Sequence, residues 1–423
     1  MHVVSLGVAT RQLWGRIGPR HPSLSRRRRH LSGTPSMLVF DRAVKRRQRD
    51  AAAAAPDHAD FEYLRRHTAS VLVDRIEDVT RSFPMALDLG CHTGHVAELI
   101  AAQKGLEGVG GVGGVRTLVQ CDFSEQALLR ARERARANQH LDTGDSGSDG
   151  DGDADSSGNG GKNGGGDGAS SGNGGDGGAS SAPATPGPEA AAGEPRVRTH
   201  FCLADEEFLP FGPGTFDLVM SNLCLHWVND LPRAMAEIRQ ALRPDGAFIG
   251  AMLGGSTLTE LRRCLLLAEQ EREGGMSTHT SPSAHVSDCG NLLQAAGFAL
   301  TTVDTETVTV HYPSALALME HLQGMGEGNA ALSRRLTVSR DTLLAAAAAY
   351  QALYGEDDGD GSISVPASFQ VCYMIGWAPH ASQQQPKRRG SATRSLKDAV
   401  SQHRMPAGDS GTTAGGGGSG GGG

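Results

Sequence analysis

The residues LDLGCHTGHVAEL, at positions 87–99, carry the strongest indication of the fold. A short apolar run ends at Asp88, and Gly90 and Gly94 then mark a turn into a segment with helical spacing. Such a strand–turn–helix unit begins a ligand pocket in open α/β sheets, because glycine lets the backbone approach the ligand closely. His92 stands where the D-x-G-x-G-x-G form of this turn has its middle glycine, so we expect a pocket whose binding is retained but altered.

On both sides of this turn, apolar runs alternate with segments of helical periodicity. Continuous apolar strands that alternate with helices predict an α/β fold, in which helices cover both faces of a parallel sheet. The expected strands are residues 84–90, 116–122, 197–205, 215–223 and 247–253, and the expected helices between them are residues 95–103, 124–139 and 230–242.

The chain changes character after residue 253. Helical spacing predicts helices at residues 257–273, 286–298, 314–323 and 341–354, while alternation predicts strands at residues 301–312 and 366–379. The sequence therefore predicts an added helical cap on the α/β domain.

Composition separates the segments that can fold from those that cannot. Residues 142–195 and the C-terminal tail consist mostly of small and polar residues, so little apolar burial opposes the entropy of ordering them. The expected organisation is a presequence (1–36), N-terminal helices with the first half of the domain (37–141), a disordered insert (142–195), the second half with the cap (196–380) and a flexible tail (381–423).

The first 36 residues contain seven arginines and no acid, with apolar residues interleaved. This composition is typical of a mitochondrial presequence. A basic arm that binds nucleic acid is the alternative, but the basic bias stops abruptly, and the formal net charge of the whole chain is −7. We therefore expect no nucleic-acid partner.

Metal-binding patterns are absent from the sequence. The seven cysteines are irregularly spaced without a C-x-x-C pair, which argues against a disulfide framework and a structural zinc site. The H-x-D motif at residues 58–60 follows an alanine run and is interpreted as a chance match. No metal site is predicted, and no apolar run approaches the roughly 20 residues of a membrane helix.

Polar residues follow four of the expected strands, at the edge where open parallel sheets bind ligands. They are Asp88, Gly90 and Gly94 after the first strand, Asp122 after the second, Asp205 and Glu206 after the third, and Ser221 and Asn222 after the fourth. A helix cap or a tight turn explains each position alone. The ordered set of four indicates a nucleoside-type ligand, with Asp122 placed to accept from ribose hydroxyls.

This order resembles the class I S-adenosylmethionine-dependent methyltransferases. The segments FDRAVKRRQRD (40–50), SNLCLHWVNDLPRAMAEI (221–238) and SVPASFQVCYMIGW (364–377) are also similar to one family within that fold. It is the family of mitochondrial NADH dehydrogenase (complex I) assembly factors described as protein-arginine hydroxylases. The resemblance covers about residues 40–141 and 196–398, nearly all of the chain that can fold.

The resemblance implies a Rossmann-like sheet with an antiparallel last strand and S-adenosylmethionine as cofactor. It also implies a location in the mitochondrial matrix, peripheral on the matrix face of the inner membrane. The implied partners are early assembly intermediates of complex I, and the implied target is an arginine of an iron–sulfur subunit. It assigns the cofactor turn to Asp88, Gly90 and Gly94, the ribose to Asp122, and the adenine to Asp205 and Glu206. The position of Ser221 and Asn222 after the fourth strand places them toward the reactive end of the ligand.

The candidates for chemistry follow the fourth strand: Asn222, His226 and Trp227. His226 is a candidate base or orienting group, and the Trp227 ring is a candidate to stack on a guanidinium. The alternative is that this LHWV segment only packs the following helix. Hydroxylation further needs an oxygen source and a redox centre, which these residues do not supply.

Three hypotheses therefore stand: an arginine hydroxylase in complex I assembly, a conventional methyltransferase on a carboxyl or protein substrate, and a non-catalytic assembly chaperone. The LADEEFLPF segment (203–211) is also similar to the biotin-pathway enzyme that methylates malonyl groups on a carrier protein. The presequence and the extent of the resemblance favour the first hypothesis.

Overall fold

The computed structural model describes residues 38–102, 110–142, 197–357, 359, 361–384 and 390–391. Contacts between Cα atoms divide the chain into two units, Met1–His380 and Ala381–Gly423, and the fold below is that of the first unit. The predicted presequence, nearly all of the predicted insert and most of the predicted tail lie outside the described residues.

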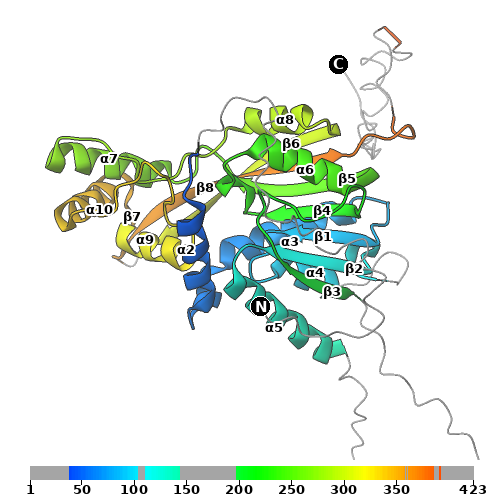
Figure 1. Ribbon diagram of the computed structural model, residues 1–423. Coiled ribbons are helices and arrows are strands. Elements are labelled where there is room, and N and C mark those ends of the chain that lie inside the picture. Colours follow the sequence, from blue (N-terminus) through cyan, green and yellow to red (C-terminus); the bar gives the residue numbers. More distant parts are fainter. Residues whose placement is uncertain are drawn as a thin grey trace, which may run out of the picture. The chain divides into compact units, whose positions relative to one another are not determined.

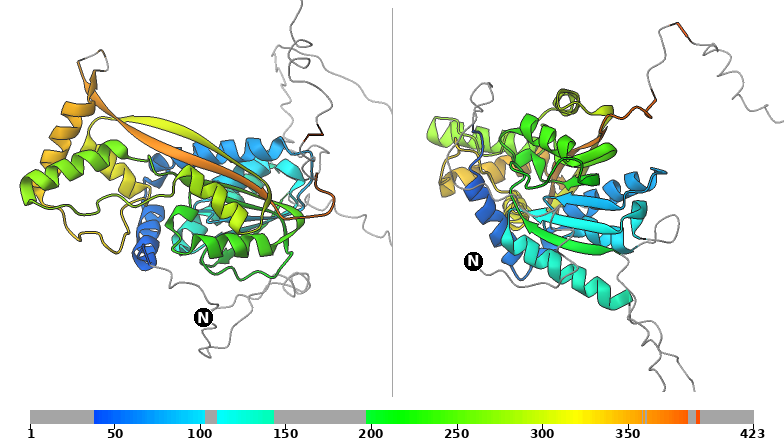
Figure 2. Two further views of the ribbon diagram at one scale, coloured as in Figure 1. Left: turned by 90° about the horizontal axis from the view of Figure 1, so that it is seen from above. Right: turned by 45° about the vertical axis from the view of Figure 1, so that its right-hand side comes forward.

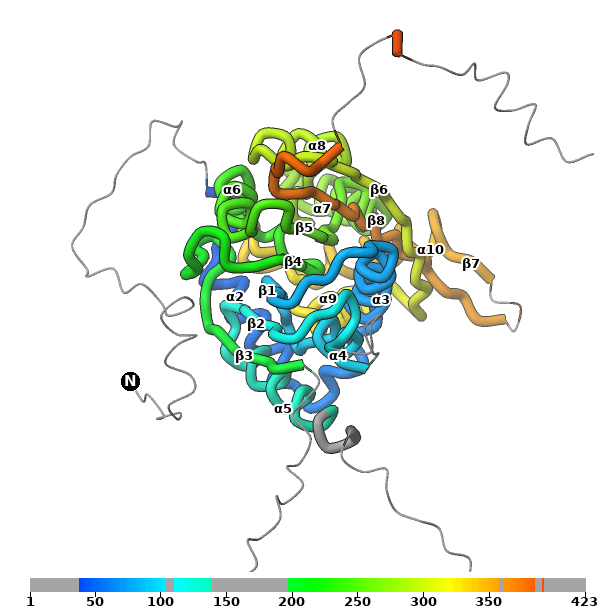
Figure 3. The backbone as a smooth tube through the Cα atoms, turned by 90° about the vertical axis from the view of Figure 1, so that its right-hand side faces the viewer, coloured from blue at the N-terminus to red at the C-terminus, as the bar shows by residue number. Residues whose placement is uncertain are grey.

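One sheet forms the centre of the first unit, with the strand order β3-β2-β1-β4-β5-β8-β6 and β7 paired to β8 (Figure 1). The first five strands of this order are parallel, whereas β8 runs antiparallel to both β5 and β6. The strands are β1 (Met85–Leu89), β2 (Thr117–Asp122), β3 (Arg198–Leu203), β4 (Phe216–Asn222), β5 (Leu242–Leu253), β6 (Ala299–Tyr312), β7 (Glu356–Asp357) and β8 (Ile363–Trp377). The α/β fold and the antiparallel last strand are confirmed, and Figure 3 shows the order from β3 to β5.

The described helices agree with the helical spacing of the sequence. The α-helices are α2 (Arg42–Ala54), α3 (Tyr63–Glu77), α4 (His95–Ala102), α5 (Glu125–Asp142), α6 (Leu231–Ala241), α7 (Thr259–Glu273), α8 (Val286–Ala295), α9 (Ala315–Gly324) and α10 (Arg340–Tyr354). Short 3-10 helices are η1 (His58–Phe61), η2 (Val112–Gly114) and η3 (Leu225–Trp227). None of the helices in the described part of the chain has the length and hydropathy to cross a membrane.

Alternation along the strands explains why both faces of the sheet are buried. Ala86 and Leu218 join the apolar cluster that includes residues of α3, α4 and α7, while their neighbours Leu87 and Val219 join the cluster that includes α6 and α8. Successive side chains of a strand point to opposite faces, so a strand buried on both sides has a continuous apolar sequence.

The predicted cap consists of α7, α9 and α10, which gather near one end of β8 (Figures 1 and 2). The hydroxyl of the buried Tyr350 on α10 donates to the Pro366 carbonyl of β8 at 2.8 Å. The cap thus packs on the antiparallel part of the sheet and extends the fold beyond the parallel strands.

The fifth strand begins earlier than its apolar run predicts. It was expected at residues 247–253, whereas β5 begins at Leu242, directly after α6. The pairing of β4 with β5 shifts register between Phe216 and Leu218, and Asp245 has a φ of +63°. A bulge therefore absorbs residues 243–246 within the strand.

Candidate functional site

The turn after β1 has the backbone that its glycines predict. Gly90 has a φ of +68° and Gly94 a φ of +89°. A Cβ at Gly90 would lie 2.1 Å from the Cys224 sulfur, and a Cβ at Gly94 would lie 2.9 Å from the Gln120 amide nitrogen. Both the conformation and the space therefore require glycine at these positions.

His92 replaces the middle glycine in the left-handed region, with a φ of +50°. Its backbone amide donates to Asp122 at 3.0 Å, and its ring Nε2 lies 3.3 Å from the Leu223 carbonyl oxygen. Burial and the nearby arginines lower the pKa of His92 well below its usual value, so the ring is neutral. The substitution is accommodated by packing the ring across the turn toward the end of β4.

Asp88 and Ser221 are buried polar side chains at this edge without hydrogen bonds. Neither the Asp88 oxygens nor the Ser221 hydroxyl has a partner within the described residues, and the same holds for the amide of Gln120, the neighbour of Asp88 on β2. Burial raises the pKa of Asp88 to about 7, against a smaller opposing effect of the Gln120 amide. Buried polar groups are normally paired, so Asp88 and Ser221 are candidates to bind a polar ligand.

Asp122 lies where the sequence predicts, but it is already occupied. Its carboxylate accepts from the backbone amides of His92 at 3.0 Å and Ser124 at 2.8 Å. The Arg49 guanidinium also lies 3.6 Å from this carboxylate, and the Asp122 side chain is 0 % exposed. A ribose has no access to this acid in the present conformation.

The occupying arginines come from α2, which lies at the carboxyl ends of the parallel strands. Arg49 donates to Glu206 at 2.9 Å, while Arg42 donates to Asp205 at 2.6 Å and also to Glu206. The two guanidinium carbons lie 4.5 Å and 4.3 Å from the centre of the Phe123 ring. The arginines lower the pKa of Glu206 to about 2 despite its burial, so the ion pairs are fully charged.

The site fits only part of S-adenosylmethionine, the cofactor that the resemblance implies. The glycine turn and the unpaired Asp88 and Ser221 suit a polar ligand. The acids assigned to ribose and adenine do not, because Arg42 and Arg49 cover them. In this conformation the residues therefore do not fit the whole of S-adenosylmethionine.

The arginines of α2 were missed by the sequence analysis, although a signal exists. Positions 42, 45 and 49 follow the i, i+3, i+7 spacing of one helical face, and all three are basic. The buried residues of α2 include Lys45 and Arg49. A basic stripe where an apolar one is expected points to acidic partners inside the fold.

Asn222, a predicted catalytic residue, is bound to α3. Its side-chain oxygen accepts from the Thr68 hydroxyl at 2.7 Å, and its nitrogen donates to the Arg65 carbonyl at 2.9 Å. These contacts hold α3 to the end of β4, so the structure places Asn222 in a supporting position.

His226 and Trp227, the other two candidates, meet at a glutamate that the sequence analysis did not identify. The Trp227 indole donates to Glu327 at 2.7 Å, His226 Nε2 lies 3.3 Å from the same oxygen, and Arg65 donates to the other oxygen at 2.6 Å. Lys45, Arg65 and the His226 hydrogen bond outweigh burial and hold the pKa of Glu327 well below its usual range. No local pattern marks Glu327, because its partners come from three distant segments.

The face of the Trp227 ring contacts a cation of the protein itself. Lys45 Nζ lies 3.1 Å from the ring centre and donates to the carbonyls of Gly326 and Gly328 at 2.9 Å each. Stacking of Trp227 on a substrate guanidinium stays a prediction, and it requires a ring surface other than the one that Lys45 covers.

No metal ligand set is found in residues 38–102, 110–142, 197–357 and 361–384: nowhere there do three or more His, Cys, Asp or Glu side chains form a group suited to a metal ion. His58, from the H-x-D motif, lies with Nδ1 3.1 Å from the Ala55 carbonyl oxygen in the turn that follows α2. That motif is accounted for by a local contact.

Known proteins resemble this chain over most of its length. The family described as "Methyltransferase domain" matches residues 184–250. The protein named "Arginine-hydroxylase NDUFAF5, mitochondrial" of Danio rerio is 42% identical over 375 residues, which are 89% of this chain and 94% of that protein. Its Homo sapiens counterpart is 42% identical over 363 residues, 86% of this chain and 84% of that protein.

A shorter similarity joins the chain to a methyltransferase. The "Malonyl-[acyl-carrier protein] O-methyltransferase" of Xylella fastidiosa is 35% identical over 193 residues, 44% of this chain and 62% of that protein.

Proposed function

The chain belongs to the family of mitochondrial arginine-hydroxylases named NDUFAF5, and from this we propose that it hydroxylates an arginine of a protein in mitochondria. The observation that carries the proposal is the 42% identity to the zebrafish protein across 94% of its length. We further propose that the target is an iron–sulfur subunit of complex I, modified in early assembly intermediates. The proposed location is the matrix, at the matrix face of the inner membrane.

The composition of the N-terminus supports the location, since residues 1–36 contain seven arginines and no acid. Hydroxylation is a two-electron oxidation of the substrate. With dioxygen as the oxidant, one oxygen atom is inserted into the substrate and the other is reduced to water by two electrons from a reductant, so the reaction requires dioxygen and an electron donor in addition to the side chains of the site.

S-adenosylmethionine is the cofactor we propose for the strand-end site. The glycine turn, the unpaired Asp88 and the unpaired Ser221 support this assignment. Binding requires that Arg42 and Arg49 first leave Asp205, Glu206 and Asp122. Titration calorimetry of the full chain with S-adenosylmethionine tests the assignment, and Asp122→Asn is expected to weaken the binding.

Mass spectrometry of complex I intermediates tests the reaction. In cells that lack this protein, one arginine of an iron–sulfur subunit is expected to lose the mass of an oxygen atom, and the full chain should restore it. If every arginine keeps the same mass in the presence and absence of the protein, the hydroxylase proposal is refuted.

A methyltransferase is the second candidate, because 193 residues are 35% identical to the Xylella carboxyl methyltransferase. In that case the missing mass is that of a methylene group, and it is found on a carboxyl or another protein side chain. The same spectra therefore separate the two candidates.

A further inference from the structure

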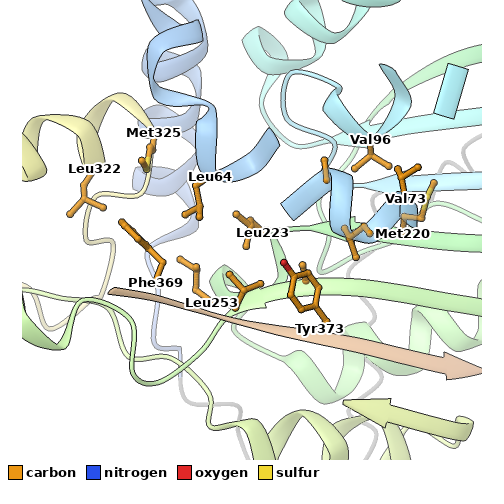
Figure 4. Packing of buried hydrophobic residues seen from close by; sticks show 14 of the residues in the cluster. Leu64, Val73, Val96, Met220, Leu223, Leu253, Leu322, Met325, Phe369 and Tyr373 are labelled. Carbon is orange, nitrogen blue, oxygen red and sulfur yellow. The ribbon is translucent and has the colours of Figure 1, made fainter. Parts of the chain in front are cut away.

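A large cavity lies beside η3, next to His226, Trp227 and Glu327. Its volume is about 500 Å³, which is within the range of ligand-binding pockets. Most of its wall is apolar and includes Leu261 and Leu265 of α7, Leu316 and Met319 of α9 and Phe369 of β8. Figure 4 shows three residues of this wall, Leu64 of α3, Leu322 of α9 and Phe369 of β8, pointing toward one another.

The polar end of the cavity offers hydrogen-bond acceptors. An ionised carboxylate has about four acceptor positions. Arg65, Trp227 and His226 use three positions on Glu327, which leaves one open. The Glu327 side chain is 8 % exposed and lines the cavity.

His226 carries a further acceptor that is closed to solvent. Its side chain is 4 % exposed and lines the cavity, but Nδ1 itself is buried and has no hydrogen-bond partner among the described residues. Burial lowers the pKa of His226, so the ring is neutral. Because Nε2 faces the carboxylate of Glu327, it carries the proton, and Nδ1 then has a free lone pair.

The carboxylates of the wall favour a cation. The residues that line the cavity include two acids, Glu320 and Glu327, and no lysine or arginine, while Lys45 contacts the wall from outside through the Trp227 ring and the Gly328 carbonyl. Arg65 neutralises Glu327 from α3, whereas Glu320 is exposed on α9, one turn from the half-exposed Leu316. An incoming cation thus meets an acid near the surface before it reaches the acceptors inside.

A long apolar stem that ends in several donors and no acceptor is the group that fits these features. We propose that the cavity is the subsite for the arginine side chain of the protein substrate, with the guanidinium bound by Glu327 and the methylene stem packed against α7, α9 and Phe369. This inference rests on the proposed function, since it assigns the substrate position for that reaction.

Binding of a small probe tests the subsite without the rest of the reaction. The probe is Nα-acetyl-arginine methylamide, and the comparison is its citrulline analogue, which has nearly the same shape but no charge. Ligand-observed NMR on the full chain is expected to show at least tenfold tighter binding of the arginine probe. Equal binding of the two compounds would overturn the assignment.

Two variants locate the bound probe. Met319→Trp fills part of the cavity from α9 and leaves Glu327 in place, and it is expected to weaken binding of the arginine probe at least tenfold. Leu353→Trp is the matched control, because Leu353 is 58% exposed on α10 and is not part of the wall. Glu327→Gln should also weaken binding tenfold or more, with circular dichroism to check that the fold survives the loss of the partner of Arg65.

The outcomes separate this inference from the proposed function. If the arginine of the subunit is modified in cells but Met319→Trp leaves both the modification and probe binding unchanged, the subsite is refuted while the hydroxylase proposal stands. If the probe binds in the cavity but no arginine is modified in cells, the subsite stands and the reaction is wrong.

Discussion

Arg49 of α2 donates a hydrogen bond to Glu206, just beyond the end of β3, at 2.9 Å, and both side chains are at most 1% exposed. The two residues are 157 positions apart in the sequence. With Arg42 on the same acids, this pair closes the ribose and adenine end of the candidate cofactor site. A ligand reaches these acids only after Arg42 and Arg49 separate from them.

Arg42→Ala is expected to strengthen S-adenosylmethionine binding about tenfold in calorimetry. The substitution removes the contacts to Asp205 and Glu206, so a larger fraction of molecules has an open site, and apparent affinity follows that fraction. Arg46→Ala is the matched control, because Arg46 lies on α2 with a half-exposed side chain whose acidic partner is Asp50. Equal affinity of the two variants would show that α2 does not limit binding.

Asp88→Asn is expected to stabilise the ligand-free protein at pH 8 and to have little effect near pH 4. The pKa of Asp88 is about 7 in the fold and about 3.9 in an unfolded chain, so the folded state holds the proton between these values. Stability therefore falls as the pH rises from 4 to 7, by up to about 4 kcal/mol, and the full loss persists above pH 7.

Urea unfolding at pH 4, 6 and 8 measures this effect. Asp60→Asn, at an exposed position of η1, serves as the control. A parallel pH dependence in wild type and Asp88→Asn would mean that Asp88 is ionised in the fold.

Gly90→Ala is expected to destabilise the protein by about 2 kcal/mol or more, because the new Cβ overlaps Cys224 and the φ is +68°. The Cβ would lie 2.1 Å from the sulfur and 2.5 Å from the Cβ of Cys224. Adding Cys224→Gly removes both atoms and should recover part of the loss in a double-mutant cycle measured by thermal unfolding. Strictly additive effects would show that the overlap is relieved by backbone movement instead.

Deletion of residues 145–190 is expected to leave the melting temperature and the binding of the arginine probe unchanged. The deleted segment connects the end of α5 to the start of β3, whereas the site residues lie at the carboxyl ends of the strands. Extra chain between elements has a small effect on the folded state. Loss of solubility or of probe binding in the shortened chain would contradict this expectation.

The sequence was sufficient for the sheet and for most of its helices. The apolar runs at 84–90 and 116–122 correspond to β1 (Met85–Leu89) and β2 (Thr117–Asp122), because alternation between two buried faces leaves a continuous apolar signal. Gly90 and Gly94 could also be identified from the local sequence, because a positive φ restricts the type of residue at these two positions. The first residues of β5 were not predicted, because the RPDG residues 243–246 lie in the register shift against β4 and carry no apolar signal.

The residues that shape the site depend on contacts between distant segments. Glu327 could not be found from its neighbours in the chain, since Arg65, His226 and Trp227 reach it from α3 and η3. Periodicity records how each segment hides its apolar side chains, and so the local sequence predicts strands, helices and the glycine turn. Which buried charges meet is set by the packing of whole elements in a medium of low dielectric constant, and that information appears only when the chain is folded.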